Sequence, residues 1–317
     1  MAERTLTRLS KQEISPSRAE TNPAVIYLAA LAPSGRRTMA ARLMMAAQLM
    51  GGDPIAIDWS ALRFEHVTAL RSRLSELGRA PASVNATLSA LRGVARAAWQ
   101  LRIMSADDYH LIAGVKNVRG SRLPAGRALT PGEIGALLEA CSSDSTAGGA
   151  RDAAIIALLY GAGLRRSEAA TLDITNYDSA SLELKVRGKG DTERLVPLES
   201  GVAAALDDWL RVRGMSEGPL LCPVRKGGKV DLRQMSAQAI YDALLKRGSA
   251  ARINSLSPHD LRRTFASDLL DVSGDVSAVQ KLLGHANVQT TMRYDRRGEA
   301  AKRKAINLLH LPYRPRF

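Results

Sequence analysis

The basic segment VKNVRGSRLPAGR, at residues 115–127, places the tightest limit on how this chain can fold. It contains glycine and proline and has no apolar period, so it predicts a linker between two separately folded parts. The chain has 317 residues, which is enough for about two ordinary domains. We therefore expect an N-terminal extension over 1–21, a helical domain over 22–114, a second domain over 128–297 and a tail helix over 298–317.

The part before the linker has the periodicity of α-helices. Apolar residues recur at helical spacing around 23–31, 36–50, 64–77 and 82–103. The fourth of these stretches carries two sets of side chains on opposite faces. Its apolar face consists of Val84, Leu88, Leu91, Ala95 and Ala98, and its polar face of Asn85, Ser89, Arg92 and Arg96. The polar face predicts a helix that lies in the major groove of DNA; the alternative is a face that is merely solvated.

The part after the linker combines helices with one β-hairpin. TPGE at 130–133 is a capping box, and helical patterns follow at 131–141 and 151–161. Leu182, Leu184 and Val186 alternate with polar residues, and a GKGD turn then leads into residues 194–198. Helical patterns dominate from there to the end of the chain. The predicted fold is therefore mainly α with a small β-sheet.

The charge balance indicates a polyanionic partner. Lysine and arginine outnumber aspartate and glutamate by 45 to 31, which gives a net charge of +14, and the excess is present on both sides of Ala125. Nucleic acid is favoured over a membrane surface. The chain has only 3 Phe, 3 Trp and 7 Tyr, which argues against binding single strands on aromatic platforms. Duplex DNA held through its phosphates fits better, and the alternative is two domains with generic basic surfaces.

The sequence predicts neither a signal peptide nor contact with a membrane. The N-terminus, MAERTLTRLSKQ, is polar, and the apolar stretch at 24–32 is half the length that a membrane-spanning helix needs. Cys141 and Cys222 are far apart and have neither metal-ligand nor disulfide spacing. We expect both to be small buried side chains in a reducing compartment, and the protein to be cytoplasmic.

Several polar side chains stand in motifs that together indicate chemistry on a phosphate. SPHD at 257–260 predicts a capped helix start, which places His259 and Arg262 on one face beside the partial positive charge of the helix N-terminus. Each motif is weak alone, since a lone histidine is usually structural and a lysine on a turn is usually solvated. Four further candidates follow the same order along the chain. Arg165 stands in GLR, Lys189 at the hairpin tip, His285 in LGH and Tyr294 in MRY.

This ordered set resembles the tyrosine recombinases of the phage-integrase family, in particular the simple core-site, Xer-like type. The resemblance rests on GAGLRRSEAATL, RGKGDTERLVPL, SPHDLRRTFAS and LLGHANVQTTMRY. It implies an N-terminal helical core-binding (SAM-like) domain and a C-terminal α+β catalytic domain. It implies a supporting role for Glu168 in the arginine pocket. The catalytic residues that it implies are Arg165, Lys189, His259, Arg262, His285 and Tyr294.

The implied chemistry explains why these residue types are needed. Tyr294 would attack a phosphodiester to give a 3′-phosphotyrosyl link and a free 5′-hydroxyl. Arg165 and Arg262 would each present a planar fork of donors to the oxygens on which negative charge grows, and His285 would add a hydrogen bond. Two protons must be transferred: Tyr294 loses one, and the leaving 5′-oxygen gains one. Lys189 and His259 would transfer them, and the sequence leaves open which residue transfers which. We expect no metal ion, because the guanidinium groups supply the charge, and no nucleotide, because the covalent link conserves the energy of the broken bond.

The residues after Tyr294 concern the association of protomers into an oligomer. Ala301, Ala305, Leu308 and Leu309 form a small apolar stripe, and the resemblance implies a tail helix that is exchanged between protomers. We expect a homotetramer on two duplex sites with inverted-repeat cores, which acts through a Holliday junction in integration, excision or resolution. Three alternatives stay open: a tail that folds back on its own domain, a topoisomerase of type IB that acts alone, and a catalytically silent DNA-binding regulator.

Overall fold

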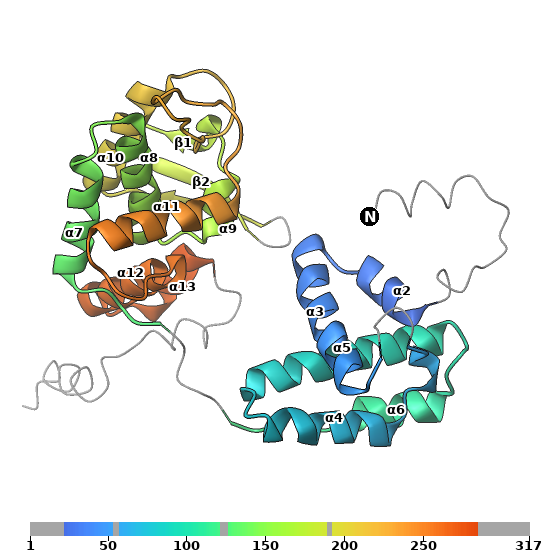
Figure 1. The fold of residues 1–317 in the computed structure, drawn as a ribbon. Helices are drawn as coiled ribbons and strands as arrows, with labels where there is room; N and C mark the ends of the chain where they lie inside the picture. The colour runs from blue at the N-terminus through green and yellow to red at the C-terminus, as the bar shows by residue number, and fades with distance from the viewer. Residues whose placement is uncertain (1–21, 53–56, 121–125, 189–191, 285–317) are drawn as a thin grey trace, which may run out of the picture. The chain divides into compact units, whose positions relative to one another are not determined.

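The structure is a computed structural model that describes residues 22–52, 57–120, 126–188 and 192–284 (Figure 1). The chain divides into two compact units, Met1–Pro124 and Ala125–Phe317. The boundary between them falls inside the predicted linker. No helix within the described ranges is long and apolar enough to cross a bilayer.

The N-terminal unit is built from helices alone in its described residues. The helices are α2 (Pro23–Ala29), α3 (Pro33–Leu49), α4 (Phe64–Glu76), α5 (Pro81–Gln100) and α6 (Ala106–Gly114), with a 3₁₀ turn at Trp59–Ala61. Proline stands in the first turn of α2, α3 and α5, where its missing N–H costs no hydrogen bond. The periodicity predicted four of these helices. It missed α6, a short helix that depends on its Ser105 cap, whose hydroxyl accepts a hydrogen bond from the Asp108 N–H.

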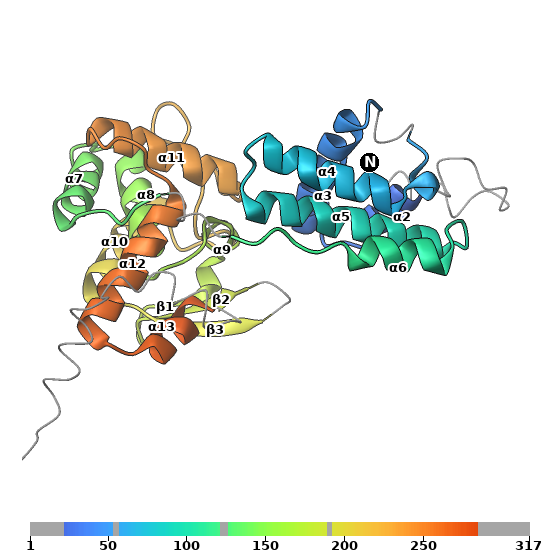
Figure 2. The ribbon, with the colours of Figure 1, turned by 90° about the horizontal axis from the view of Figure 1, so that it is seen from below.

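Helix α5 lies at the centre of this unit and contacts the other helices around it (Figure 2). The apolar face predicted for it is confirmed, because Val84, Leu88, Leu91, Ala95 and Ala98 are all at most 1% exposed. This stripe packs against α2, α3 and α4 as part of the buried hydrophobic core of the unit.

The C-terminal unit combines helices with a three-stranded antiparallel sheet (Figure 1), one face of which is exposed. Its strands β1 (Tyr177–Asp178), β2 (Glu183–Arg187) and β3 (Glu193–Pro197) pair in chain order. The predicted hairpin is confirmed as β2 and β3, with Leu184 opposite Val196. The helices are α7 (Pro131–Ser142), α8 (Ala147–Ile156), α9 (Arg166–Ala170), α10 (Ser200–Arg213), α11 (Ala237–Ala250), α12 (Pro258–Ser273) and α13 (Val276–Leu283).

Both ends of the predicted linker are fixed to the unit that they adjoin. On the N-terminal side, the Val118 N–H donates to Asn85 Oδ1 over 2.8 Å. On the C-terminal side, the Arg127 N–H donates to Asp260 Oδ1 over 3.1 Å, and a Cβ on Gly126 would lie only 2.1 Å from that oxygen. The linker over 115–127 stays a prediction, and within it Val118 and Arg127 are held by side chains of the unit that each adjoins. Composition shows that a segment is polar, but it does not show which side chains will hold it.

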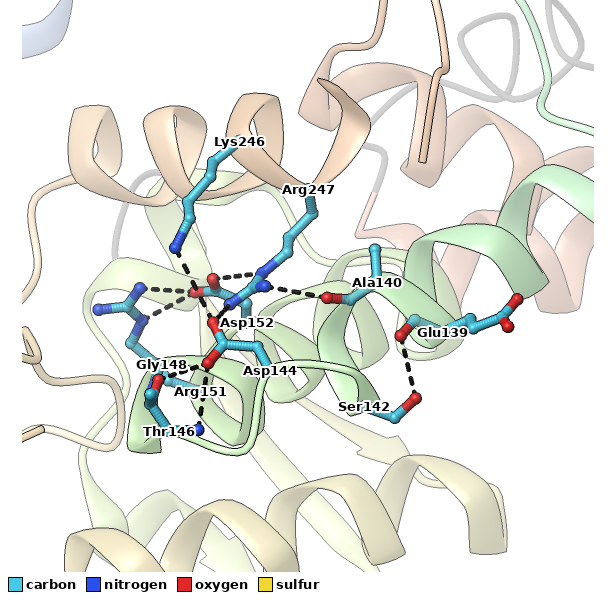
Figure 3. Close-up of polar contacts among 10 residues, drawn as sticks. All are labelled: Glu139, Ala140, Ser142, Asp144, Thr146, Gly148, Arg151, Asp152, Lys246 and Arg247. Carbon is cyan, nitrogen blue, oxygen red and sulfur yellow. Dashed lines mark hydrogen bonds and ion pairs between the residues drawn. The ribbon is translucent and has the colours of Figure 1, made fainter. Parts of the chain in front are cut away.

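A buried ion network joins three helices of the C-terminal unit (Figure 3). Arg247 on α11 donates to Asp152 on α8 over 2.7 Å, to Asp144 over 2.6 Å and to the Ala140 carbonyl over 2.9 Å. Arg151 donates twice to the other carboxylate oxygen of Asp152. Asp152 and Arg247 are 1% and 3% exposed, so each depends on the other for its charge to be tolerated.

We expect Arg247→Met to destabilise the C-terminal unit by about 3–5 kcal/mol, because two carboxylates would lose their buried partner. Native-state hydrogen exchange of the α8 and α11 amides measures this change locally. The control is Arg211→Met, which breaks an exposed pair with Asp208 and should cost less than about 1 kcal/mol. Equal protection in the two variants would contradict this role for the network.

Candidate active site

The first part of the site is a break in helical geometry after α8. Residues Ala157–Gly161 form a π-helical turn, in which the Ala162 N–H donates to the Ala157 carbonyl. Gly163 follows with φ +62°, and a Cβ on it would lie 2.4 Å from the Phe265 ring. Only glycine fits both the conformation and the space. The turn delivers Arg165 to the N-cap of α9.

Glu168 gathers guanidinium groups around one buried carboxylate. It accepts hydrogen bonds from the Arg165 N–H over 2.8 Å and from Arg165 Nη1 over 2.6 Å, and it accepts two more from Arg194. Arg262 Nη1 lies 3.7 Å away. Burial by itself would raise the pKa of this carboxyl, but the hydrogen bonds from Arg194 and Arg165 outweigh it and hold the pKa below its usual range. The supporting role of Glu168 in an arginine pocket stays a prediction.

Helix α12 supplies the second part of the site. Its capping box joins Ser257 and Asp260, as the SPHD motif predicts. Arg262, one turn on, is 2% exposed and donates to the carbonyls of Gly163 and Leu283. It therefore ties the turn before Arg165 to the end of α13.

His259 is exposed at the start of α12. Partial loss of water around the ring lowers its pKa, and the positive charges of Arg263 and Arg262 lower it further. The neutral imidazole is consequently the main form at pH 7, and a neutral imidazole can accept a proton.

The three predicted catalytic residues within the described ranges share one pocket of about 520 Å³. Helices α9, α11 and α12 form its walls. Its lining consists of Arg165, Arg166, Gln238, Tyr241, Ser257, Pro258, His259 and Arg262. Lys189, His285 and Tyr294, the other predicted catalytic residues, lie outside the described residues. In the part of the chain that is described, no three His, Cys, Asp or Glu side chains gather as a metal site would require.

Sequence patterns did not point to Gln238, Tyr241 or Arg194. The Arg166 guanidinium lies 5.5 Å from the centre of the Tyr241 ring, which brings α11 against α9. A signal for Arg194 was present in the hairpin, where an arginine stands opposite the buried Val186. Alternation alone would have assigned both residues to the same face of the sheet, and a long charged side chain on a buried face needs a partner.

The structure gives two of the predicted DNA-binding residues a role within the protein. Asn85 exchanges two hydrogen bonds with the backbone of Val118, and Arg92 donates to Asn117 Oδ1 over 3.1 Å and to the Val115 carbonyl. They hold the segment that follows α6. Ser89 and Arg96, on the same helix, are exposed. Contact between this helix and DNA stays a prediction.

The comparisons with known proteins agree on one class. The model of the phage integrase family matches residues 127–300. The tyrosine recombinase XerC of Shewanella amazonensis is 34% identical over 238 residues, which cover 74% of this chain and 77% of the relative. A solved XerH site-specific recombinase bound to difH substrate covers 97% of this chain and 89% of its own, with a TM-score of 0.64 and 18% identity. A lambda integrase dimer bound to a COC′ core site covers 87% of this chain and 93% of its own, with a TM-score of 0.64 and 15% identity.

The solved structures share the fold: helices with a small antiparallel sheet, as in tyrosine recombinases. The predicted fold class is thereby confirmed. The chain belongs to the phage integrase family, and the prediction of a tyrosine-type site-specific recombinase is confirmed with it.

Gly163→Ala tests the geometry of the site. We expect backbone strain to cost about 1–3 kcal/mol, measured by urea unfolding, because alanine rarely adopts a positive φ. The shift of the Gly163 carbonyl should also displace Arg262 and slow DNA cleavage about 100-fold. The control is Gly135→Ala in α7, where a Cβ meets open space and should leave both measurements close to wild type or gain stability. Wild-type cleavage by Gly163→Ala would show that Arg262 needs no such support.

A pair of substitutions on α5 separates contact with DNA from support of the chain. Arg96→Ala should weaken DNA binding and reduce its salt dependence by about one phosphate's share, with no loss of stability. Arg92→Ala should instead lower the hydrogen-exchange protection of residues 115–118. An unchanged salt slope in Arg96→Ala would contradict the major-groove prediction at that position.

Proposed function

We propose that this chain cuts and rejoins duplex DNA at a specific core site through a 3′-phosphotyrosyl intermediate on Tyr294. The observation that carries the proposal is the convergence of Arg165, His259 and Arg262 on one pocket, next to the buried carboxylate of Glu168. The reactions that we propose are integration, excision or resolution, with a Holliday junction between the two strand exchanges. We expect the protein to act in the cytoplasm.

In the cleavage step, one covalent bond replaces another. The Tyr294 oxygen forms a bond to phosphorus, the bond from phosphorus to the 5′-oxygen breaks, and the 5′-oxygen takes up a proton. Rejoining is the reverse reaction, so the energy of the broken bond is kept in the phosphotyrosyl link. No nucleotide is needed for rejoining.

The arginines act on the charge that develops in this step. As five oxygens surround the phosphorus, negative charge grows on the non-bridging oxygens, and preorganised donors stabilise that charge more than they stabilise the ground state. Arg165 is 40% exposed in its side chain and lines the pocket, which suits contact with a phosphate. His285 would add a further hydrogen bond.

Different residues transfer the two protons: one accepts the proton of Tyr294, and the other gives a proton to the leaving 5′-oxygen. The tyrosine, with an ordinary pKa of about 10, must lose its proton on attack. The lowered pKa of His259 supports it as the acceptor, since the neutral ring predominates at pH 7. Lys189 would then give a proton to the leaving 5′-oxygen.

The partner that we propose is duplex DNA with an inverted-repeat core. A net charge of +14 supports a polyanion. The solved neighbours XerH and lambda integrase were determined on difH substrate and on a COC′ core site, which supports duplex DNA for this chain as well.

We further propose a homotetramer on two DNA sites, joined by the tail. The C-terminal unit has an apolar groove of about 560 Å³ in which Val272 is 86% exposed. The apolar stripe of the tail matches it in chemistry, because alanine and leucine side chains would cover apolar surface. The groove is lined by residues that include Leu138, Tyr160, Val202, Phe265, Leu269 and Val272.

Covalent capture on unselected host DNA tests the function and reveals the core sequence in the same experiment. The wild type and Tyr294→Phe are expressed with host DNA, the mixture is denatured, and DNA that remains attached to protein is sequenced at its ends. We expect attached DNA with one shared end sequence from the wild type only, because the variant lacks the nucleophile but keeps its grip on phosphates. A captured duplex should also be cleaved in EDTA, since arginines supply the charge.

Attached DNA from Tyr294→Phe would overturn the assignment of the nucleophile. Site binding without any adduct from the wild type would instead favour a silent DNA-binding regulator. Adducts by a monomer, without pairing of two sites, would favour a topoisomerase.

A further inference from the structure

Arg194 stands in β3 on the face of the sheet that is turned inward, and its side chain is only 14% exposed. Its two terminal nitrogens donate to both oxygens of Glu168, over 3.2 Å and 3.0 Å. Its Nε donates to the Leu282 carbonyl over 2.8 Å. One planar group thus binds a carboxylate on one edge and a backbone carbonyl through its third nitrogen.

The Leu282 contact fixes the last turn of α13. Carbonyls at the end of a helix have no partner within the helix, so they need one elsewhere. Arg194 binds the carbonyl of Leu282, and Arg262 binds that of Leu283. Figure 2 shows α13 beside β3, as these contacts require.

Gly284 fits this arrangement closely. It caps α13 with φ +61°, and a Cβ on it would lie 3.1 Å from Arg194 Nη1. A glycine here lets the guanidinium approach the end of the helix. The next residue in the sequence is His285, so the chain enters that position from a turn that Arg194 holds.

The contact between Arg194 and Glu168 also affects Arg165 and Arg262, because all three arginines lie around the same carboxylate. Arg165 is hydrogen-bonded to Glu168, whereas Arg262 stays 3.7 Å away and donates to carbonyls instead. If Arg194 were removed, the buried carboxylate would lose two hydrogen bonds and would attract Arg262 to replace them. The pocket would then present its two guanidinium groups in different positions.

We propose that Arg194 is a positioning residue for DNA cleavage, which holds Glu168 with its two arginines on one side and the end of α13 on the other. The inference rests on the proposed function, since it assigns Arg165 and Arg262 to the scissile phosphate. Arg194 itself is not required to touch the DNA.

Single-turnover cleavage tests the inference. Arg194→Lys and Arg194→Met are compared with the wild type on a nicked duplex that carries the captured core site, with protein in excess. Lysine keeps the charge but has no planar fork, so it cannot bind both Glu168 oxygens and Leu282 together. We expect adduct formation to slow about 100-fold in both variants, with unchanged affinity for the duplex. Arg211→Lys, at an exposed ion pair on α10, is the matched control and should cleave as the wild type does.

A second substrate separates positioning from loss of folded protein. A methyl group in place of one non-bridging oxygen at the scissile phosphate removes its negative charge, so misplaced arginines matter less. We expect the defect of Arg194→Lys to shrink about tenfold on this substrate. An equal defect on both substrates, or wild-type cleavage by both variants, would overturn the inference. Adduct formation by the wild type in the same assay reports separately on the proposed function.

Discussion

The buried carboxylate of Glu168 is the interaction on which the candidate site depends. It is 5% exposed, which would be unfavourable for a charge without partners, and three arginines from α9, β3 and α12 surround it. The same ion pairs that make the buried carboxylate tolerable also bring together three elements far apart in the chain. An arginine pocket for a phosphate therefore needs a negative charge behind it, because like charges would otherwise repel one another.

Departures from regular geometry position the candidate catalytic residues. The π-helical turn and Gly163 follow α8 so that Arg165 caps the N-terminus of α9, and Gly284 caps α13 against Arg194. The buried network of Arg247 and Asp152 holds α11 against α8. That placement matters for the site, because α11 contributes Tyr241 to the pocket wall. Stability and function are thus connected through the position of one helix.

The described residues on either side of the unit boundary are held by side chains that composition does not indicate. Asn85 and Arg92 hold the segment that follows α6, and Asp260 holds the backbone of Arg127 on the other side. Asp260 also belongs to the capping box of α12, the helix that carries His259 and Arg262. The first described residues of the C-terminal unit are thus held directly by the helix that carries two of the candidate catalytic residues.

The sequence by itself determined four of the N-terminal helices, the hairpin, the capping box of α12 and the ordered set of candidate catalytic residues. Those features are local: the periods of 3.6 and 2, the caps and the motif spacings depend on neighbours a few residues away. Only the tertiary structure decided that Arg92 binds Asn117 rather than standing free for DNA, and that Arg194 shares Glu168 with Arg165. The physical reason is that a charged side chain takes its partner from whatever folding brings near it. Position 194 is 26 residues from Glu168 and 88 from Leu282, distances over which no local pattern carries information.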